Sequence, residues 1–215
     1  MTGKPASSRT AASGRQVRPW AVVSAGLAPV LLVGSWAIAG ALQPGSYSPV
    51  RQTVSVLAGQ AGADRWLMTT GLLLVGGCHL VTAAGLTGIP ARARITLVIA
   101  GLASIGIAAS PEPVHGTSHE HLAWTVLGAA AITLWPALAA TSSPTRSLLL
   151  SSRGAAAGTA VLVALLGWLI IETQGGAMLG LAERVTTAAQ TTLPFIIALA
   201  LRRNTPRAAP QHQLP

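Results

Sequence analysis

Three of the five histidines in this 215-residue chain lie in one short polar stretch, residues 110–121, together with two of its five acidic residues. These side chains are His115, His119, His121, Glu112 and Glu120. Neutral imidazoles can hold Zn²⁺, and a carboxylate can add an oxygen ligand or serve as general base for a metal-bound water. One interpretation is therefore a zinc site, and with it a metal-assisted hydrolase that acts on lipid at the outer leaflet.

The alternative for the same stretch is a solvated polar loop that opens a helix. The segment Thr117-Ser-His-Glu120 fits a capping box, in which a hydroxyl and a carboxylate satisfy the first free amides of a helix. Gly116 argues against a helix through residues 115–119. On a helix, side chains two positions apart also point to different sides, as those of His119 and His121 would. Both interpretations stay open at this point.

A second group of polar side chains runs through the last apolar segment of the chain. The group consists of Glu183, Thr187, Gln190, Thr191 and Pro194, whose spacing places them on one helical face. Because lipid cannot satisfy these groups, the face should line the interior of a bundle or a water-filled cleft. We predict a polar cleft that opens to the outer side, lined by Glu183, Arg184, Thr187 and Gln190. Simple hydrogen bonding between helices is the alternative.

His79 and Arg51 are also assigned to this cleft. His79 lies deep in an apolar segment, where an ionisable side chain is costly and is usually paired or functional. It would serve as a proton relay, or be a neutral histidine bonded to a hydroxyl such as that of Ser104. A bis-histidine haem would need a second histidine at similar depth, so no cofactor is predicted beyond the zinc alternative. Arg51 would bind an anionic lipid headgroup, neutralise nearby acids or stay solvated.

The elements that must position these residues follow from composition. The chain is 51% hydrophobic and 9% charged, whereas soluble domains carry about 25% charged residues. Its net charge of +9 does not indicate nucleic-acid binding, because the basic residues fall between apolar runs. Each run has about the 20 residues that a membrane span needs. We predict an all-α, polytopic bundle of six transmembrane helices at about 19–42, 66–87, 93–110, 118–140, 154–171 and 178–201.

The distribution of charge orients this bundle. Eleven of the fourteen basic residues lie in the two tails and in the second and fourth loops. Only Arg51, Arg65 and Arg184 lie on the other side, with all five acids. The positive-inside rule then places both termini in the cytoplasm of a cell-membrane protein. Residues 1–18 and 203–215 are predicted to be basic cytoplasmic tails, the first of them disordered, around a domain at 19–202.

Two further predictions concern the segments near the first span. The first apolar run is longer than the 7–15 residues of a secretory signal, which favours a retained anchor over a cleaved one. In the loop 43–65, Ser48 as N-cap and Pro49 as first helical residue predict a short surface helix that stops at Gly59. Asp64 is expected to cap the second span.

The loop motifs, taken in order, resemble a known family. They are Ser46-Tyr-Ser-Pro-Val-Arg-Gln-Thr53, Asp64-Arg-Trp-Leu-Met68, Cys78-His-Leu-Val-Thr82, Pro111-Glu-Pro-Val-His-Gly-Thr-Ser-His119 and Gly180-Leu-Ala-Glu-Arg184. Together they are similar to the bacterial six-helix membrane family called domain of unknown function 998, over roughly residues 19 to 202. The resemblance implies a multi-pass membrane protein and supplies no established reaction.

The sequence is therefore compatible with three functions. The first is binding of a lipid headgroup or small polar molecule in the outward-facing cleft, with transport or a partner role as variants. The second is the metal-assisted hydrolase, and the third is a structural membrane subunit. The lipid bilayer is the one partner that all three share. The chain has no Gly-rich phosphate loop, no Gly-x-Ser-x-Gly and no Cys-x-x-Cys, so a nucleotide enzyme of the soluble type is not expected.

Overall fold

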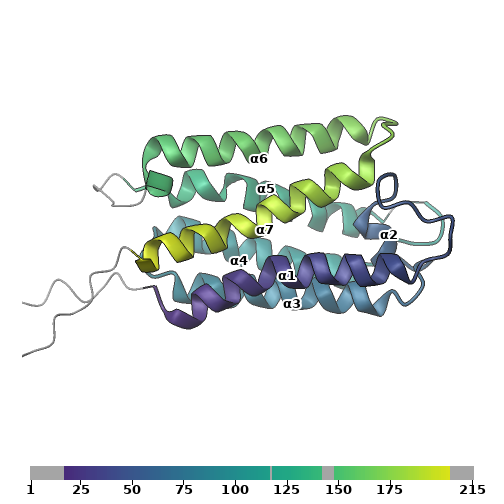
Figure 1. Ribbon diagram of the computed structural model, residues 1–215, viewed down its shortest axis with the longest axis horizontal. Helices are drawn as coiled ribbons and strands as arrows, with labels where there is room; N and C mark the ends of the chain where they lie inside the picture. Colours follow the sequence, from purple (N-terminus) through teal and green to yellow (C-terminus); the bar gives the residue numbers. More distant parts are fainter. Residues whose placement is uncertain (1–16, 117, 142–147, 204–215) are drawn as a thin grey trace, which may run out of the picture.

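The computed structural model describes residues 17–116, 118–141 and 148–203, and throughout these residues the regular structure is helical (Figure 1). Six of the helices are long and apolar enough to cross a membrane. The elements are α1 (Pro19–Ala41), α2 (Val54–Ala58), α3 (Trp66–Gly85), α4 (Ala91–Ala109), α5 (His119–Ala139), the 3-10 helix η1 (Leu148–Leu150), α6 (Ser152–Glu172) and α7 (Leu179–Arg203). The chain is therefore a multi-pass membrane protein.

The six predicted spans are confirmed, each to within two residues at either end. Local chemistry explains several of these ends. Pro19 occupies the first turn of α1, where its missing N–H removes no helical hydrogen bond. The hydroxyls of Ser118 and Ser151 accept from the amides of His121 and Gly154 and so cap α5 and α6. The predicted tails lie largely outside the described residues.

The long helices form a closed ring in sequence order. Each packs against the next one along the chain, and α7 packs back against α1 (Figure 1). The described chain begins and ends at one end of the bundle, here called the terminal end, and α2 lies at the opposite end, the α2 end. All five acidic residues belong to segments at the α2 end. The predicted separation of acids from most bases is therefore present in the fold.

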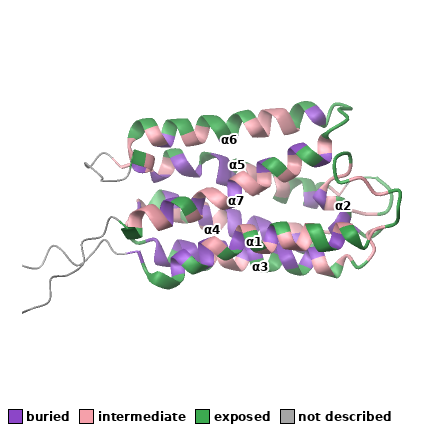
Figure 2. Cartoon of the chain, in the orientation of Figure 1, coloured by how far each residue is buried: buried purple, intermediate pink, exposed green. Residues whose placement is uncertain are grey.

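Burial divides the helices into inner and outer faces (Figure 2). Trp135, Leu97 and Ile197 belong to a buried apolar cluster, whereas large apolar side chains such as Val30 and Ile171 are exposed. Exposed apolar surface of this extent fits contact with lipid rather than water. The outermost helix is α6, of which only three residues are buried.

Two glycines bring α3 and α4 into close contact. A Cβ atom added to Gly76 would lie 2.7 Å from the carbonyl oxygen of Gly101, and one added to Gly101 would lie 2.9 Å from the carbonyl oxygen of Gly76. The neighbouring Gly77 has nothing within 4 Å of an added Cβ. Small residues of this kind let membrane helices approach backbone to backbone.

Two arginines complete helix ends at the terminal end of the bundle. Arg92 donates to the carbonyl oxygens of Leu138 and Ala140, at 3.0 and 3.1 Å, where α5 ends. Arg94 donates through Nε to the carbonyl oxygen of Ala83, at 2.8 Å, near the end of α3. The last carbonyls of a helix have no partner within it, and a cation there also suits the helix dipole.

Candidate functional site

The segment between α1 and α3 folds across the α2 end, and two details of its prediction were wrong. The short helix begins at Val54 with Thr53 as N-cap, not at Ser48 and Pro49. Ser48 instead opens a turn, in which its carbonyl oxygen accepts from the amides of residues 51 and 52. Asp64 does not cap α3 through its side chain, because it adopts a positive φ of 48° and the N-cap position falls on Arg65.

Arg184 of α7 holds this segment in place. Its Nη1 donates to the carbonyl oxygens of Pro49 (2.7 Å) and Gln52 (2.8 Å), and also to that of Gly180 in its own helix (2.9 Å). Its Nη2 donates to the hydroxyl of Tyr47. Burial raises the pKa of Tyr47 above its ordinary value, against an opposing effect of the Arg184 charge. A cation directed at backbone carbonyls thus ties the segment to α7.

Glu183 and Gly180 complete the attachment. The Glu183 carboxylate accepts from the amide of Val54 at 2.5 Å, so a residue 129 positions away supports the first turn of α2. The amide of Leu181 donates to the carbonyl oxygen of Val50 at 3.0 Å. A Cβ atom on Gly180 would lie 2.2 Å from the Gln52 carbonyl oxygen, so only glycine allows the segment to approach this closely.

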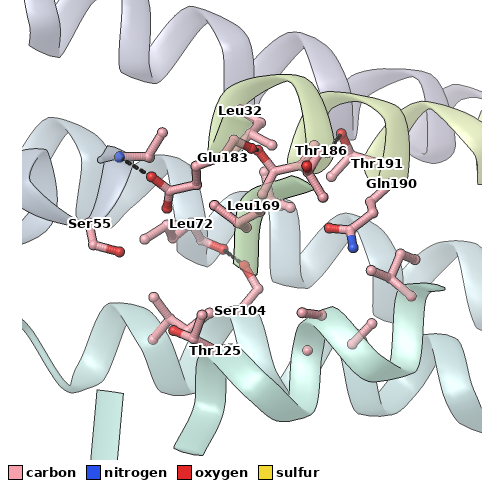
Figure 3. A pocket seen from close by; sticks show the side chains of 18 of the residues that line it. Leu32, Ser55, Leu72, Ser104, Thr125, Leu169, Glu183, Thr186, Gln190 and Thr191 are labelled. Carbon is pink, nitrogen blue, oxygen red and sulfur yellow. Dashed lines mark hydrogen bonds between the residues drawn. The ribbon is translucent and has the colours of Figure 1, made fainter. Parts of the chain in front are cut away.

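Beneath α2 lies a cavity of about 150 Å³ at the centre of the ring. Polar residues from several helices face one another across it, as Figure 3 shows for Glu183 and Gln190 of α7 and for Ser104 and Thr125 on the opposite helices. The polar residues lining it are Ser55, His79, Ser104, Thr125, Glu183, Thr186, Thr187, Gln190 and Thr191.

Most of these polar groups already have partners. The hydroxyl of Ser104 donates to the Leu72 carbonyl oxygen at 2.8 Å, and Gln190 donates to the hydroxyl of Thr133 at 2.9 Å. Two atoms are exceptions among the described residues that line the cavity. The buried Nδ1 of His79 and the buried Oγ1 of Thr125 have no hydrogen-bond partner. An unsatisfied buried polar atom is costly, and such atoms often mark an unseen water or ligand.

Four of the six residues predicted to line a cleft do line this cavity. They are Glu183, Thr187, Gln190 and His79. Arg184 is turned toward the loop carbonyls, and Arg51 is exposed, with no side-chain hydrogen bond or ion pair to the described residues. Ser104, expected as a partner of His79, donates to the backbone of α3 instead. Val54 and Ser55 of α2 line the cavity at this end, and an opening to the outer side stays a prediction.

The three histidines of residues 110–121 lie in different environments in the structure. His115 and His119 are exposed and His121 is buried. Nδ1 of His121 donates to the Ser110 carbonyl oxygen at 2.8 Å, and its Nε2 lies 3.1 Å from the Ser55 hydroxyl and 3.8 Å from a Glu112 oxygen. These contacts tie α5 to α2 and to the end of α4.

Within the described part of the chain, no three His, Cys, Asp or Glu side chains are placed to hold one metal ion. Glu120 is exposed in the first turn of α5, and Glu112 is half-buried. Ser118 caps α5, one position after the Thr117 expected to do so, and Thr117 lies outside the described residues. The zinc site stays an untested prediction, and the contacts of His121 are structural ones.

Sequence reasoning missed Tyr47, Thr125 and Gly180 as parts of this site. Tyr47 is the only tyrosine of the chain, and it stands in a loop that was predicted to lie at the membrane surface. Thr125 is one of two threonines in the apolar run of α5, and nothing in its spacing distinguishes it. Gly180 opens the motif Gly180-Leu-Ala-Glu-Arg184, where a glycine is compatible with close backbone approach but does not by itself predict it.

A ring of six apolar helices around a cavity with polar lining residues defines a multi-pass membrane protein of the helical-bundle class. The chain belongs to the family described as "Protein of unknown function (DUF998)", which matches residues 26–200. The resemblance drawn from the loop motifs is thereby confirmed. No curated protein and no solved structure matches the chain.

Proposed function

We propose that this protein binds a small polar molecule, or the headgroup part of a lipid, in the cavity at the centre of its helix ring. The observation that carries the proposal is the pair of unsatisfied atoms, His79 Nδ1 and Thr125 Oγ1, on residues that line the same cavity. A ligand that supplies a donor and an acceptor there would remove the cost of leaving them unpaired.

The size and charge of the cavity narrow the ligand class. A cavity of about 150 Å³ holds a molecule of about six non-hydrogen atoms, the size of benzene. Among the described residues no Lys or Arg side chain lies within ion-pair distance of Glu183, so its carboxyl group is the acidic group of the cavity wall and is available to a cationic ligand. The proposed ligand is therefore a small amine that also carries a hydroxyl, such as ethanolamine, either free or as the headgroup of a lipid.

Replacing Thr125 with valine tests this proposal. The change removes an unpaired hydroxyl with little change of shape, so the fold should lose no stability while ligand affinity falls about tenfold for one lost hydrogen bond. Thr159→Val is the matched control, because Thr159 also has a buried unpaired hydroxyl but does not line the cavity. Binding of ethanolamine is measured by calorimetry on detergent-purified protein, and binding of lipid with phosphatidylethanolamine in nanodiscs.

Two results would contradict the proposal. The first is equal ethanolamine affinity in the Thr125→Val variant and the parent. The second is the absence of binding by the parent to ethanolamine and to phosphatidylethanolamine alike. Binding of the lipid alone would assign the cavity to a headgroup, and binding of the free amine would assign it to a soluble ligand.

We also propose that both termini face the cytoplasm. This orientation places α2 on the outer side of the cell membrane. The clustering of eleven of the fourteen basic residues on the tails and terminal-end segments supports this orientation. A membrane-impermeant maleimide applied to intact cells should label His115→Cys and spare Arg153→Cys, both in a Cys78→Ser background. Both positions are exposed at opposite ends of the bundle. Labelling of Arg153→Cys alone would invert the topology.

A further inference from the structure

A second hollow lies on the outside of the bundle, near the terminal end and away from the central cavity. It has a volume of about 380 Å³ and runs between the last turns of α3 and the first turns of α4. The lining residues are Leu80, Ala83, Ala84, Ala91, Arg94, Ile95, Val98 and Ile99. Three alanines leave the space open, and larger aliphatic side chains form its walls. This α3–α4 groove spans about 12 Å along α4 at 1.5 Å per residue.

Arg94 is the only charged residue that lines the groove. Its Nε donates a hydrogen bond to the Ala83 carbonyl oxygen. Its terminal nitrogens make no hydrogen bond or ion pair with the described residues. All five acidic residues of the chain belong to segments at the α2 end, so no acidic side chain of this protein stands near Arg94. Its position in the first turn of α4 places the charge where the apolar span begins.

We propose that the α3–α4 groove binds one anionic phospholipid, with an acyl chain between the two helices and the phosphate group against Arg94. The apolar walls suit a hydrocarbon chain, since Ile95 is 60% exposed and must be covered by apolar material in a membrane. The guanidinium offers its free terminal nitrogens to phosphate oxygens, which it can bind in a bidentate manner.

Charge selects the headgroup. A zwitterionic lipid fills the apolar part of the groove equally well, but it carries an ammonium group that cancels the charge of its phosphate. A lipid such as phosphatidylglycerol keeps one net negative charge, which Arg94 favours by about fivefold, the usual effect of one basic residue at a membrane surface. The groove is thus expected to discriminate by headgroup charge and to require an acyl chain.

Native mass spectrometry of the delipidated full-length protein tests this inference, with added phosphatidylglycerol or phosphatidylcholine as probes. The parent should bind phosphatidylglycerol about fivefold more tightly than phosphatidylcholine. Arg94→Gln should bind both lipids equally, whereas Arg94→Lys should keep most of the preference because it keeps the charge. Arg153→Gln, which removes an exposed arginine of α6 at the same end, should leave the preference unchanged.

A second pair of variants tests the groove itself. Ala84→Leu places a larger side chain in the space, and because Ala84 is exposed the helix should still fold. It should lose the bound phosphatidylglycerol, whereas Ala156→Leu, an exposed position of α6 outside the groove, should retain it. Inorganic phosphate should not displace the lipid.

Four results would overturn the proposal. They are equal binding of the two lipids by the parent, an unchanged preference in Arg94→Gln, retention of the lipid by Ala84→Leu, and full displacement by inorganic phosphate. A delipidated protein that dimerises through this face, with Ala84→Leu preventing the dimer, would assign the groove to a second copy of the chain instead.

Discussion

Replacing Arg184 with glutamine is expected to lower the free energy of unfolding by at least about 3 kcal/mol. The guanidinium donates to the carbonyl oxygens of Pro49 and Gln52 and to the hydroxyl of Tyr47. A hydrogen bond from a charged group contributes about 1.5–3 kcal/mol, and more than one would be lost. Glutamine is shorter and uncharged, so it cannot replace these bonds together. The measurement is equilibrium unfolding in mixed detergent micelles.

Arg51→Gln is the control for charge. Arg51 stands in the same loop but is exposed, and its side chain has no hydrogen bond to the described residues, so its loss should change stability by less than about 0.5 kcal/mol. Hydrogen exchange supplies a second measurement, because the amide of Val54 should exchange faster when the segment is released. Similar unfolding curves for the two variants would show that Arg184 does not hold the loop.

Gly76→Ala is expected to destabilise the bundle by about 3 kcal/mol. The added methyl group would lie 2.7 Å from the Gly101 carbonyl oxygen and 2.7 Å from a side-chain carbon of Ile105. A Cβ atom does not approach other heavy atoms this closely, so α3 and α4 would have to separate along their contact and lose packing there. The effect is measured by unfolding of the purified protein in mixed micelles.

The next residue provides the matched control. Gly77 lies in the same helix with nothing within 4 Å of an added Cβ, so Gly77→Ala should be neutral or raise stability by up to about 1 kcal/mol through helix propensity. Both variants carry the same helix-propensity change, which therefore cancels between them. If Gly77→Ala were as harmful as Gly76→Ala, the close contact between α3 and α4 could not be the cause.

The spans could be predicted from sequence because their signal is local. A membrane helix needs about 20 consecutive apolar residues, and this need is met or not met within each run. The polar face of α7 was also readable, since Glu183, Thr187 and Gln190 repeat at helical spacing, and all three line the cavity. What the spacing could not give is the depth of the cavity or the residues on the facing helices.

The errors have a common physical origin in contacts between distant residues. Ser48 and Pro49 suit a turn as well as a helix start, and the start at Val54 is supported by Glu183, 129 residues later. In the same way, the neighbours Glu183 and Arg184 point in different directions on α7, so one lines the cavity and the other holds the loop. No local pattern around residue 48 contains this information.

The polar face of α7 also bears on how the protein is made. This helix has the lowest mean hydropathy of the six spans, 1.2 against 2.2 for α6, and it follows the other five in the chain. Without α7, the cavity would lack the wall that lies opposite residues such as Thr125. The other five long helices cannot form a closed ring by themselves, because α7 is the helix that packs against both α6 and α1. Membrane insertion of α7 is therefore expected to close the ring and to complete the cavity wall in one step.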